Sequence, residues 1–247
     1  MNNSFGNAAR LIGAGLRALL VLTLVTGVLY PLLVTGVAQG LFNDKANGSE
    51  IKSDGKVVGS ELIGQTYYLP LKAASDSTTG DDAEEAPRPD LKWFQPRPSN
   101  GLGSNSVNTQ YSLILSGATN RSGDNGVGED GKCPTDPTKA EEGSLCQQVV
   151  AAKDAVIADN ETPTYKVRPS DVPADAVTSS GSGLDPDISP EYAKLQVHRV
   201  AEKNNLTVAQ VDKLVDDHTD GRILGFMGEP TVNVLKLNIA LKELAKG

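Results

Sequence analysis

A long apolar stretch near the N-terminus constrains this chain more than any other feature of its sequence. Residues 18–38 carry no formal charge, and twelve of these 21 residues are leucine or valine. As an α-helix the stretch would be about 31 Å long, close to the ~30 Å thickness of the hydrocarbon core of a bilayer. Leucine and valine favour insertion into lipid, so the stretch is predicted to form a transmembrane helix.

The charges that flank this stretch predict its orientation. Arg10 and Arg17 precede it, no acidic residue occurs in the first 43 positions, and Asp44 and Lys45 follow it as a neutral pair. The positive-inside rule then predicts a cytoplasmic segment over 1–17, a transmembrane helix over 18–40 and an extracytoplasmic domain over 41–247.

The alternative is a cleaved secretory signal followed by a secreted domain that starts at Gln39. The small residues over 36–38 resemble a cleavage site. However, the apolar region of a signal peptide typically has only about 7 to 15 residues, and this stretch is longer. The length therefore favours a retained anchor.

Two features break the regularity of the predicted helix. Pro31 removes a backbone donor, which predicts a kink near Gly27, and the membrane tolerates this kink if Thr26 or a neighbouring helix satisfies the freed carbonyl. Thr23, Gly27 and Thr35 are separated by multiples of four residues, and small residues let a second helix approach closely. They are predicted to contact a partner in the membrane, although glycine and threonine are also common in such helices without any partner.

Composition limits what the rest of the chain can bind. The formal net charge is −8, and without the two arginines of the first 43 residues it is −10. An acidic domain is a poor ligand for nucleic acid and for an anionic membrane surface. Aromatic residues make up 4% of the chain, which contains 25 glycines and 14 prolines. This composition predicts one modest core with long loops.

The two cysteines, Cys133 and Cys146, are predicted to form a disulfide, because the topology places both outside the cell. A metal or redox pair is the alternative, but the C-x-x-C spacing and a nearby histidine are missing.

Periodicity and turn residues predict an α+β extracytoplasmic domain, with a small β region plus three to four helices, on a single N-terminal transmembrane helix. The β region comprises a hairpin over 50–58 and strand-like pieces at 62–63 and 67–69, and polar inserts are expected near 72–90 and 119–146. Helices are expected over 146–158, 190–203, 208–218 and 233–246, with the three C-terminal ones packed on the early sheet. The region 162–177 is expected to be extended.

Helix-capping residues support the C-terminal helices. Ser189 can cap a helix that begins with Pro190, and Thr207 with Gln210 forms a capping-box pattern. Asn233 can cap the last helix.

The sequence does not indicate catalytic, cofactor-binding or metal-binding residues. Residues 126–131 match G-x-G-x-x-G, but no predicted strand precedes them and no apolar helix follows. His198 and His218 fit surface or packing roles on helices. Asp185 and Asp187 would make at most a weak cation site, and stabilisation of a helix start is the simpler interpretation.

Several short motifs, in chain order, resemble the C subunit of the Kdp-type potassium-transporting P-type ATPase. The longest is S-G-S-G-L-D-P-D-I-S-P over 180–190. The positions that carry the resemblance are Asn47, Gly48, Ser49, Gly64, Gln65, Arg97, Pro98, Ser99, Ser182, Gly183, Leu184, Asp185, Ile188, Ser189, Pro190, Gln196, Arg199, Val200, Asn233, Leu237 and Asn238.

The resemblance implies a non-catalytic accessory subunit of a high-affinity, ATP-driven potassium import complex in the bacterial inner membrane. The implied partners are a channel-like potassium-binding subunit, a P-type ATPase subunit and a small single-helix subunit. The implied role is assembly and coupling, as a catalytic chaperone that raises the ATPase subunit's affinity for ATP. ATP and potassium act at the level of the complex. A membrane-tethered or secreted hydrolase or binding module is the alternative.

Two departures from the family pattern matter. The family commonly has an aromatic-Phe-His-Gly sequence before Arg-Pro-Ser, where this chain has W-F-Q-P over 93–96, so the role of that histidine cannot be transferred. The inserts near 72–90 and 119–146 are also extra. ATP is found in the cytoplasm, and only about 17 residues of this chain are expected to lie there. A role in assembly is therefore favoured over direct binding of ATP.

Overall fold

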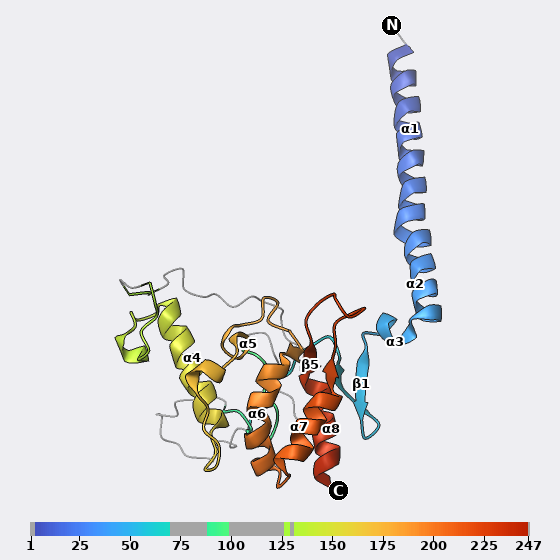
Figure 1. The fold of residues 1–247 in the computed structure, drawn as a ribbon. Coiled ribbons are helices and arrows are strands. Elements are labelled where there is room, and N and C mark those ends of the chain that lie inside the picture. Colours follow the sequence, from blue (N-terminus) through green and yellow to red (C-terminus); the bar gives the residue numbers. More distant parts are fainter. Residues whose placement is uncertain (1–2, 70–87, 99–125, 129–130, 247) are drawn as a thin grey trace, which may run out of the picture. The chain divides into compact units, whose positions relative to one another are not determined.

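The chain divides into two compact units between Ser49 and Glu50 in the computed structural model. The structure describes residues 3–69, 88–98, 126–128 and 131–246. The first unit is helical and the second combines helices with two small sheets (Figure 1). The predicted class, an α+β domain with a single N-terminal apolar helix, is thereby confirmed.

The N-terminal unit consists mainly of one continuous helical rod. Helix α1 (Asn3–Leu24), a π-helical turn η1 (Val25–Leu29) and α2 (Tyr30–Leu41) follow one another without a break. Within the described residues, Gly6–Leu41 is the one helix that is long and apolar enough to cross a membrane. A short helix, α3 (Asn43–Ala46), follows it.

The π-helical turn lies where the proline was expected to kink the helix. The backbone N–H of Tyr30 donates to the carbonyl of Val25, five residues back. The hydroxyl of Thr26 donates to the carbonyl of Leu22 at 2.7 Å, rather than to the carbonyl that Pro31 frees. The helix thus accommodates the proline by widening one turn.

The second unit, which starts at Glu50 and is called the compact unit below, begins with the predicted hairpin. Strands β1 (Glu50–Ser53) and β2 (Lys56–Ser60) pair antiparallel, with Ser53 opposite Lys56. Asp54 and Gly55 have φ of 50° and 77°, the pair of left-handed conformations that a type I′ turn requires.

The strand-like pieces predicted after the hairpin are mostly wrong. Residues 62–63 form a turn, and Tyr68 makes only an isolated bridge to Pro89. Of the apolar side chains there, Tyr67 is buried in the core at 1% exposed, whereas Leu62 and Leu69 are 62% and 43% exposed.

The predicted helices are confirmed to within two residues at each end. They are α4 (Leu145–Asn160), α6 (Pro190–Lys203), α7 (Val208–Asp217) and α8 (Val234–Lys246). The hydroxyl of Ser189 accepts from the N–H of Tyr192, and Thr207 and Gln210 complete the capping box. The region expected to be extended also holds η3 (Pro169–Asp171) and α5 (Ala174–Val177), and η2 (Pro137–Lys139) precedes α4.

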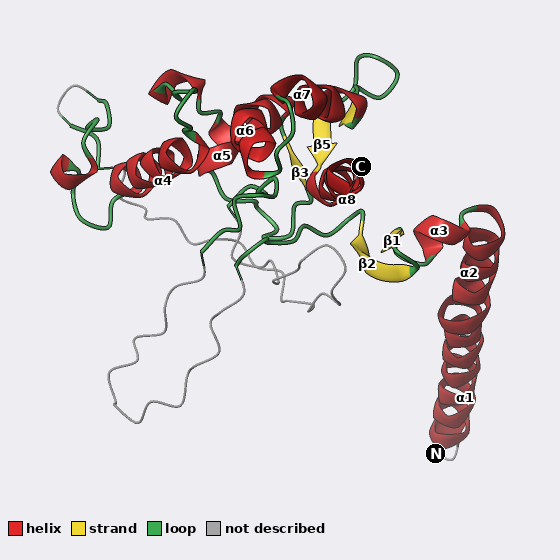
Figure 2. Cartoon of the chain, turned by 90° about the horizontal axis from the view of Figure 1, so that it is seen from below, coloured by secondary structure: helices red, strands yellow, loops and turns green. Residues whose placement is uncertain are grey.

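A three-stranded sheet that the sequence did not predict supports the C-terminal helices. Strands β3 (Asp187–Ile188), β4 (Thr219–Asp220) and β5 (Thr231–Asn233) are antiparallel in the order β3-β5-β4. Helices α6 and α8 both contact β5 (Figure 2). The expectation that the helices pack on the early hairpin is correct for α8, because Lys242 pairs with Asp54 and a Cβ at Gly59 would lie 2.7 Å from the side chain of Leu235. Helix α6 packs instead on α4, α7 and β5. Strands of two or three residues are too short for periodicity to detect.

The core of the compact unit lies among these helices and β5. Its fully buried side chains include Phe94, Val200, Val211, Val232, Leu237 and Leu241. Residues 72–87 of the first predicted insert, residues 119–125 and 129–130 of the second, and Ser99 lie outside the described residues.

Candidate functional site

The polar side chains at the motif positions are mainly inside the compact unit, where they hold its backbone together. Apart from Ser99 the structure describes every motif position, and within the compact unit Ser182 alone among them is exposed. The positions whose hydrogen bonds define this arrangement are Gly64, Gln65, Arg97, Asp185, Gln196, Arg199, Asn233 and Asn238.

Arg199 is a buried cation held by neutral oxygen atoms. It is 2% exposed, and its Nη1 donates to the carbonyls of Leu91 and Trp93. Its Nη2 donates to Oε1 of Gln196, and its Nε donates to Oδ1 of Asn160 at 2.9 Å. Burial lowers the pKa of Arg199 to about 10, so the guanidinium stays charged at neutral pH. The side chain therefore fixes the loop that contains Trp93 to helices α4 and α6.

Two buried side-chain amides pair with the backbone of neighbouring residues. Gln196, on α6, accepts from the N–H of Gln95 at 2.7 Å and donates to its carbonyl at 3.1 Å. Asn238, on α8, accepts from the N–H of Phe94 and donates to its carbonyl, both at 2.9 Å. Both amides are fully buried. The segment around Phe94 is thus clamped between two helices.

Gln95 occupies the position where the family commonly has a histidine. Its side-chain Nε2 donates to the carbonyls of Asp90 and Trp93, at 2.9 and 3.3 Å. In this chain the position closes a local turn, which needs an amide donor and no titratable group.

The two aspartates considered as a cation site have other partners. Oδ2 of Asp185 is 2.9 Å from Nη1 of Arg97, and Oδ1 of Asp187 accepts from Nδ2 of Asn233 at 3.0 Å. The described residues contain no group of three or more histidine, cysteine or acidic side chains that could hold a metal ion. Neither aspartate caps the following helix either. The cap of this helix is Ser189, and Asp175 fixes its position. The carboxylate of Asp175 accepts hydrogen bonds from the N–H and the hydroxyl of Ser189.

A second set of motif residues joins the hairpin region to the rest of the unit. The N–H of Gly64 donates to the carbonyl of Leu184 at 2.8 Å, and Nε2 of Gln65 donates to the carbonyl of Val58 at 2.9 Å. Gly59 is needed beside them, because a Cβ there would lie 2.0 Å from Nε2 of Gln65.

Asn233 connects the same region to α8. Its Nδ2 donates to the carbonyl of Glu61, and its Oδ1 accepts from the N–H of Lys236 at the start of the helix. Burial raises the pKa of Asp187, which also accepts from this amide.

Other motif positions have local roles. In the N-terminal unit, the amide of Asn47 bonds to Gln39, and Gly48 and Ser49 take positive φ in a turn. The hydroxyl of Ser182 accepts from the N–H of Leu184. The remaining ones have packing, turn or helix-start roles, namely Pro98, Gly183, Ile188, Ser189, Pro190, Val200 and Leu237.

The histidines have structural surroundings. The ring of His198 stacks on Tyr165 with 3.8 Å between centroids, and Nδ1 of His218 lies 2.9 Å from the carbonyl of Leu214. Each contact accounts for its histidine without a catalytic role.

Thr23, Gly27 and Thr35 of the apolar helix are exposed within their own unit. In an unbroken α-helix, at about 100° per residue, Thr23 and Thr35 would lie about 120° apart around the axis. The π-helical turn between them takes up one extra residue, which reduces this angle to about 20°. The turn therefore brings Thr23 and Thr35 to one face, with Gly27 inside it.

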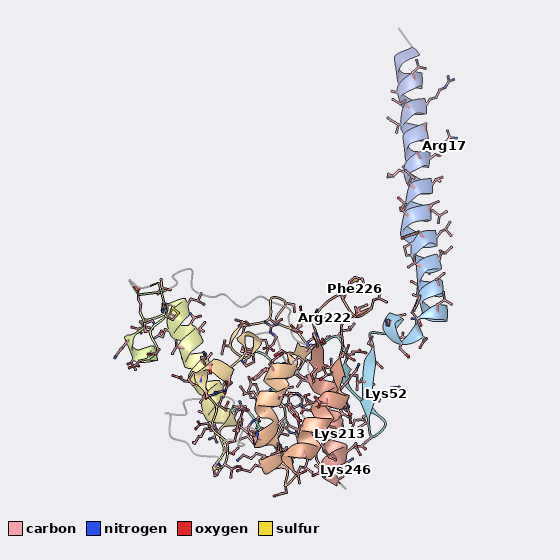
Figure 3. All side chains as sticks on the ribbon, in the orientation of Figure 1. Arg17, Lys52, Lys213, Arg222, Phe226 and Lys246 are labelled. Carbon is pink, nitrogen blue, oxygen red and sulfur yellow. A yellow bond between two sulfur atoms is a disulfide. The ribbon has the colours of Figure 1, made fainter. Side chains whose placement is uncertain are left out.

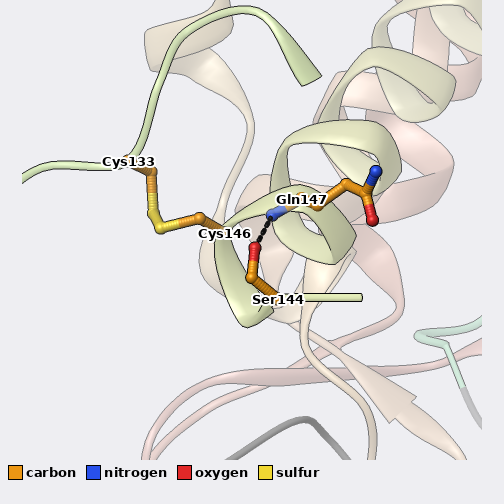
Figure 4. The surroundings of a disulfide bond; sticks show 4 residues. All are labelled: Cys133, Ser144, Cys146 and Gln147. Atoms are coloured by element: carbon orange, nitrogen blue, oxygen red, sulfur yellow. Dashed lines mark hydrogen bonds between the residues drawn. A yellow bond between two sulfur atoms is a disulfide. The ribbon is translucent and has the colours of Figure 1, made fainter. Parts of the chain in front are cut away.

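The two cysteines form a disulfide at the start of α4 (Figure 4). Cys146 follows the helix cap, where the hydroxyl of Ser144 accepts from the N–H of Gln147 at 3.2 Å. Gly126, the first glycine of the G-x-G-x-x-G match, approaches this cap so closely that a Cβ would lie 2.3 Å from Oγ of Ser144. This glycine thus has a packing role.

One cavity of about 300 Å³ lies beside the clamped segment, lined by residues that include Arg97, Asp159 and Arg199. Both arginines already have protein partners. Burial raises the pKa of Asp159, and the charge of Arg199 partly offsets this effect.

Sequence reasoning missed one exposed feature. Between β4 and β5, four large apolar side chains within five residues are exposed, namely Ile223, Leu224, Phe226 and Met227. The signal was present as I-L-G-F-M, but the glycines on either side indicated only a turn.

Comparison with known proteins identifies the family. The family model described as "K+-transporting ATPase, c chain" matches residues 12–243. A potassium-transporting ATPase KdpC subunit of Streptomyces avermitilis is 69% identical over 99% of this chain and 98% of its own length. Its counterpart in Mycobacterium tuberculosis is 40% identical over 93% of this chain and 96% of its own length. As the motifs predicted, this chain belongs to the family of KdpC subunits of potassium-transporting ATPases.

Proposed function

We propose that this chain is a non-catalytic accessory subunit of a high-affinity, ATP-driven potassium import complex in the bacterial inner membrane. The observation that carries the proposal is the family match over nearly the whole chain. Its partners in this proposal are a channel-like potassium-binding subunit, the P-type ATPase subunit and a small single-helix subunit.

The use of the polar residues supports an accessory role. The motif side chains in the described part of the compact unit satisfy the unit's own backbone groups, as Gln196 and Asn238 do. Such residues maintain a shape that a partner can recognise, whereas a catalytic group must face its substrate.

In the proposed topology, residues 1–17 are cytoplasmic, 18–40 span the membrane and 41–247 are extracytoplasmic. The extracytoplasmic part would comprise a connecting segment up to Ser49 and the compact unit from Glu50 onward. Because so little of the chain is cytoplasmic, its effect on the ATPase subunit's affinity for ATP would act through assembly of the complex. This is the chaperone role that we assign to it.

The apolar helix would be both an anchor and a contact. Thr23, Gly27 and Thr35 would form the face that a helix of another subunit approaches. The π-helical turn supports this assignment, because without it Thr35 would point away from Thr23.

The decisive experiment compares complexes that contain altered versions of this chain. Removing residues 1–49, or replacing the helix with an unrelated single-pass helix of the same orientation, is expected to abolish potassium-stimulated ATP hydrolysis or raise the KM for ATP. Full activity with the truncated chain would contradict the proposal.

A finer version tests the helix face. Gly27→Leu is expected to reduce the recovery of partner subunits, whereas Val28→Leu, which keeps a large side chain on a neighbouring face, should not. Equal recovery with both variants would remove the small residues from the proposed contact while leaving the accessory role intact.

A further inference from the structure

The loop that connects β4 to β5 presents a contiguous apolar surface. Ile223, Leu224, Phe226 and Met227 are 67%, 80%, 70% and 48% exposed. Single exposed apolar side chains are ordinary, but four within five consecutive residues form a patch of the kind that marks interaction sites. We call residues 223–227 the apolar loop.

The apolar loop is preformed. The N–H of Ile223 donates to the carbonyl of Met227 at 2.8 Å, and the reverse bond is 3.0 Å long. The loop is mounted on β4 and β5, which pair with each other and reach the core at Val232. Its base is closed by an ion pair of 2.6 Å between Arg222 and Glu229. Figure 3 labels Phe226 in this loop and Arg222 beside it. Because the loop is already held in one conformation, little conformational entropy would be lost when it binds a partner.

The backbone of the apolar loop is strained at its most exposed residue. Leu224 has φ of 54°, a conformation that leucine rarely adopts and that costs free energy. Its side chain is 80% exposed, so packing within the compact unit does not offset that cost. Strain of this kind is typical of segments that are shaped for binding.

The charges around the apolar loop distinguish between two kinds of binding partner, a lipid surface and a protein. Residues 50–247 contain 20 lysines and arginines against 30 aspartates and glutamates, a net charge of −10. Between residues 219 and 231, Arg222 is the one basic residue, and Asp220 and Glu229 are acidic. Basic residues strengthen the attraction of an apolar segment to anionic lipids, and the apolar loop has one basic neighbour against two acidic ones. The charges therefore favour a protein.

We propose that the apolar loop docks into an apolar pocket of another membrane-embedded subunit of the same potassium-transporting ATPase; this inference rests on the proposed function. Alone, five residues are too few for a stable interface. The compact unit, however, begins nine residues after the apolar helix ends at Leu41, a reach of about 32 Å at most. A tether this short keeps the compact unit close to partners in the same membrane and raises its effective concentration for them, so that a small anchor suffices.

Photocrosslinking in the assembled complex tests the occupant directly. A photoreactive phenylalanine derivative at position 226 of the full-length chain is expected to form an adduct with one membrane-embedded subunit of the ATPase, identified by mass spectrometry. The same group at Val208, an apolar position on α7 that is 41% exposed, is the control and should give no such adduct. Adducts only with lipid, only with a second copy of this chain, or with neither would overturn the proposal.

Substitutions test whether the contact matters. The double variant Leu224→Asn with Phe226→Ser removes the apolar anchors, and asparagine tolerates the positive φ at 224. Its apparent affinity for the partner subunits is expected to fall by about 30-fold, whereas Val208→Ser should leave it unchanged. Unchanged affinity in the double variant would contradict docking, and the crosslink decides the matter if that variant fails to fold.

The same preparations separate this inference from the proposed function. If omission of the whole chain leaves potassium-stimulated ATP hydrolysis unaffected, the proposed function is wrong. If omission abolishes hydrolysis but the apolar loop neither crosslinks nor affects affinity, only the docking proposal is wrong.

Discussion

Two regions depart from the usual pattern of apolar side chains inside and polar side chains outside. They are the clamped segment around Phe94 and the apolar loop. Around the segment, an arginine and two amides are inside the compact unit, and Arg199, Gln196 and Asn238 are each at most 2% exposed. In the apolar loop, aliphatic and aromatic side chains are outside it. The contrast shows that the polar motif residues maintain the fold, while the apolar loop leaves its side chains exposed for the partner that we propose. Stability and assembly should therefore respond to different substitutions.

The largest expected effect is on stability, from Arg199→Met. The substitution removes the donor of the Leu91 carbonyl and of Oδ1 of the buried Asn160, and each such unpaired group costs about 1 to 3 kcal/mol. We expect the free energy of unfolding to fall by about 3 kcal/mol, measured by urea denaturation. Lys203→Met, at an exposed position of the same helix, should change it by less than about 0.5 kcal/mol. Similar values for the two variants would remove Arg199 from its structural role.

Asn238→Leu is expected to have the next largest effect. Leucine has a similar size, but it leaves the N–H and carbonyl of Phe94 unpaired inside the core. The expected loss is about 2 kcal/mol. Glu243→Leu, at an exposed position of α8, is the control. A loss confined to partner binding, with unchanged stability, would break the distinction between the two regions.

A smaller effect, opposite in sign, is expected from Asp159→Asn. Burial raises the pKa of Asp159 above its ordinary value, so the charged form costs stability at neutral pH. The asparagine variant should be more stable than the parent chain at pH 7. This advantage should disappear as the pH falls through the raised pKa to below 3.8, where the parent side chain is protonated in both the folded and unfolded states. Thermal unfolding at several pH values measures the difference, with the exposed Asp154→Asn as control. A pH-independent difference would refute the charge argument.

The smallest effect on stability is expected from Phe226→Ser. The side chain is 70% exposed, so the free energy of unfolding should change by less than about 0.5 kcal/mol. Together with the loss of partner affinity, this result would complete the separation of the two regions. A loss of 2 kcal/mol or more would show that the apolar loop stabilises its own unit instead.

Local chemistry explains which elements could be predicted. Ser189 with Pro190, and Thr207 with Gln210, determine where α6 and α7 begin through contacts only three residues apart. The hairpin turn at Asp54 and Gly55 is equally local. Such signals are contained in a short window of sequence.

The clamps could not be predicted because their partners are distant in the chain. Asn238 bonds to a residue 144 positions away, and Gln196 to one 101 positions away. A single sequence shows both as polar residues within helices, where a surface position is the usual expectation. For the same reason the sequence did not predict that α6 is buried on nearly all sides.

The clamped segment also has a consequence for aggregation. An extended segment normally offers its N–H and carbonyl groups as an edge to which another strand can add. Here the groups of Phe94 are taken by α8 and those of Gln95 by α6, through side chains alone. Each of the two amides thus makes the hydrogen bonds that a neighbouring strand would otherwise make. A strand of a second molecule therefore cannot pair with the backbone of these residues.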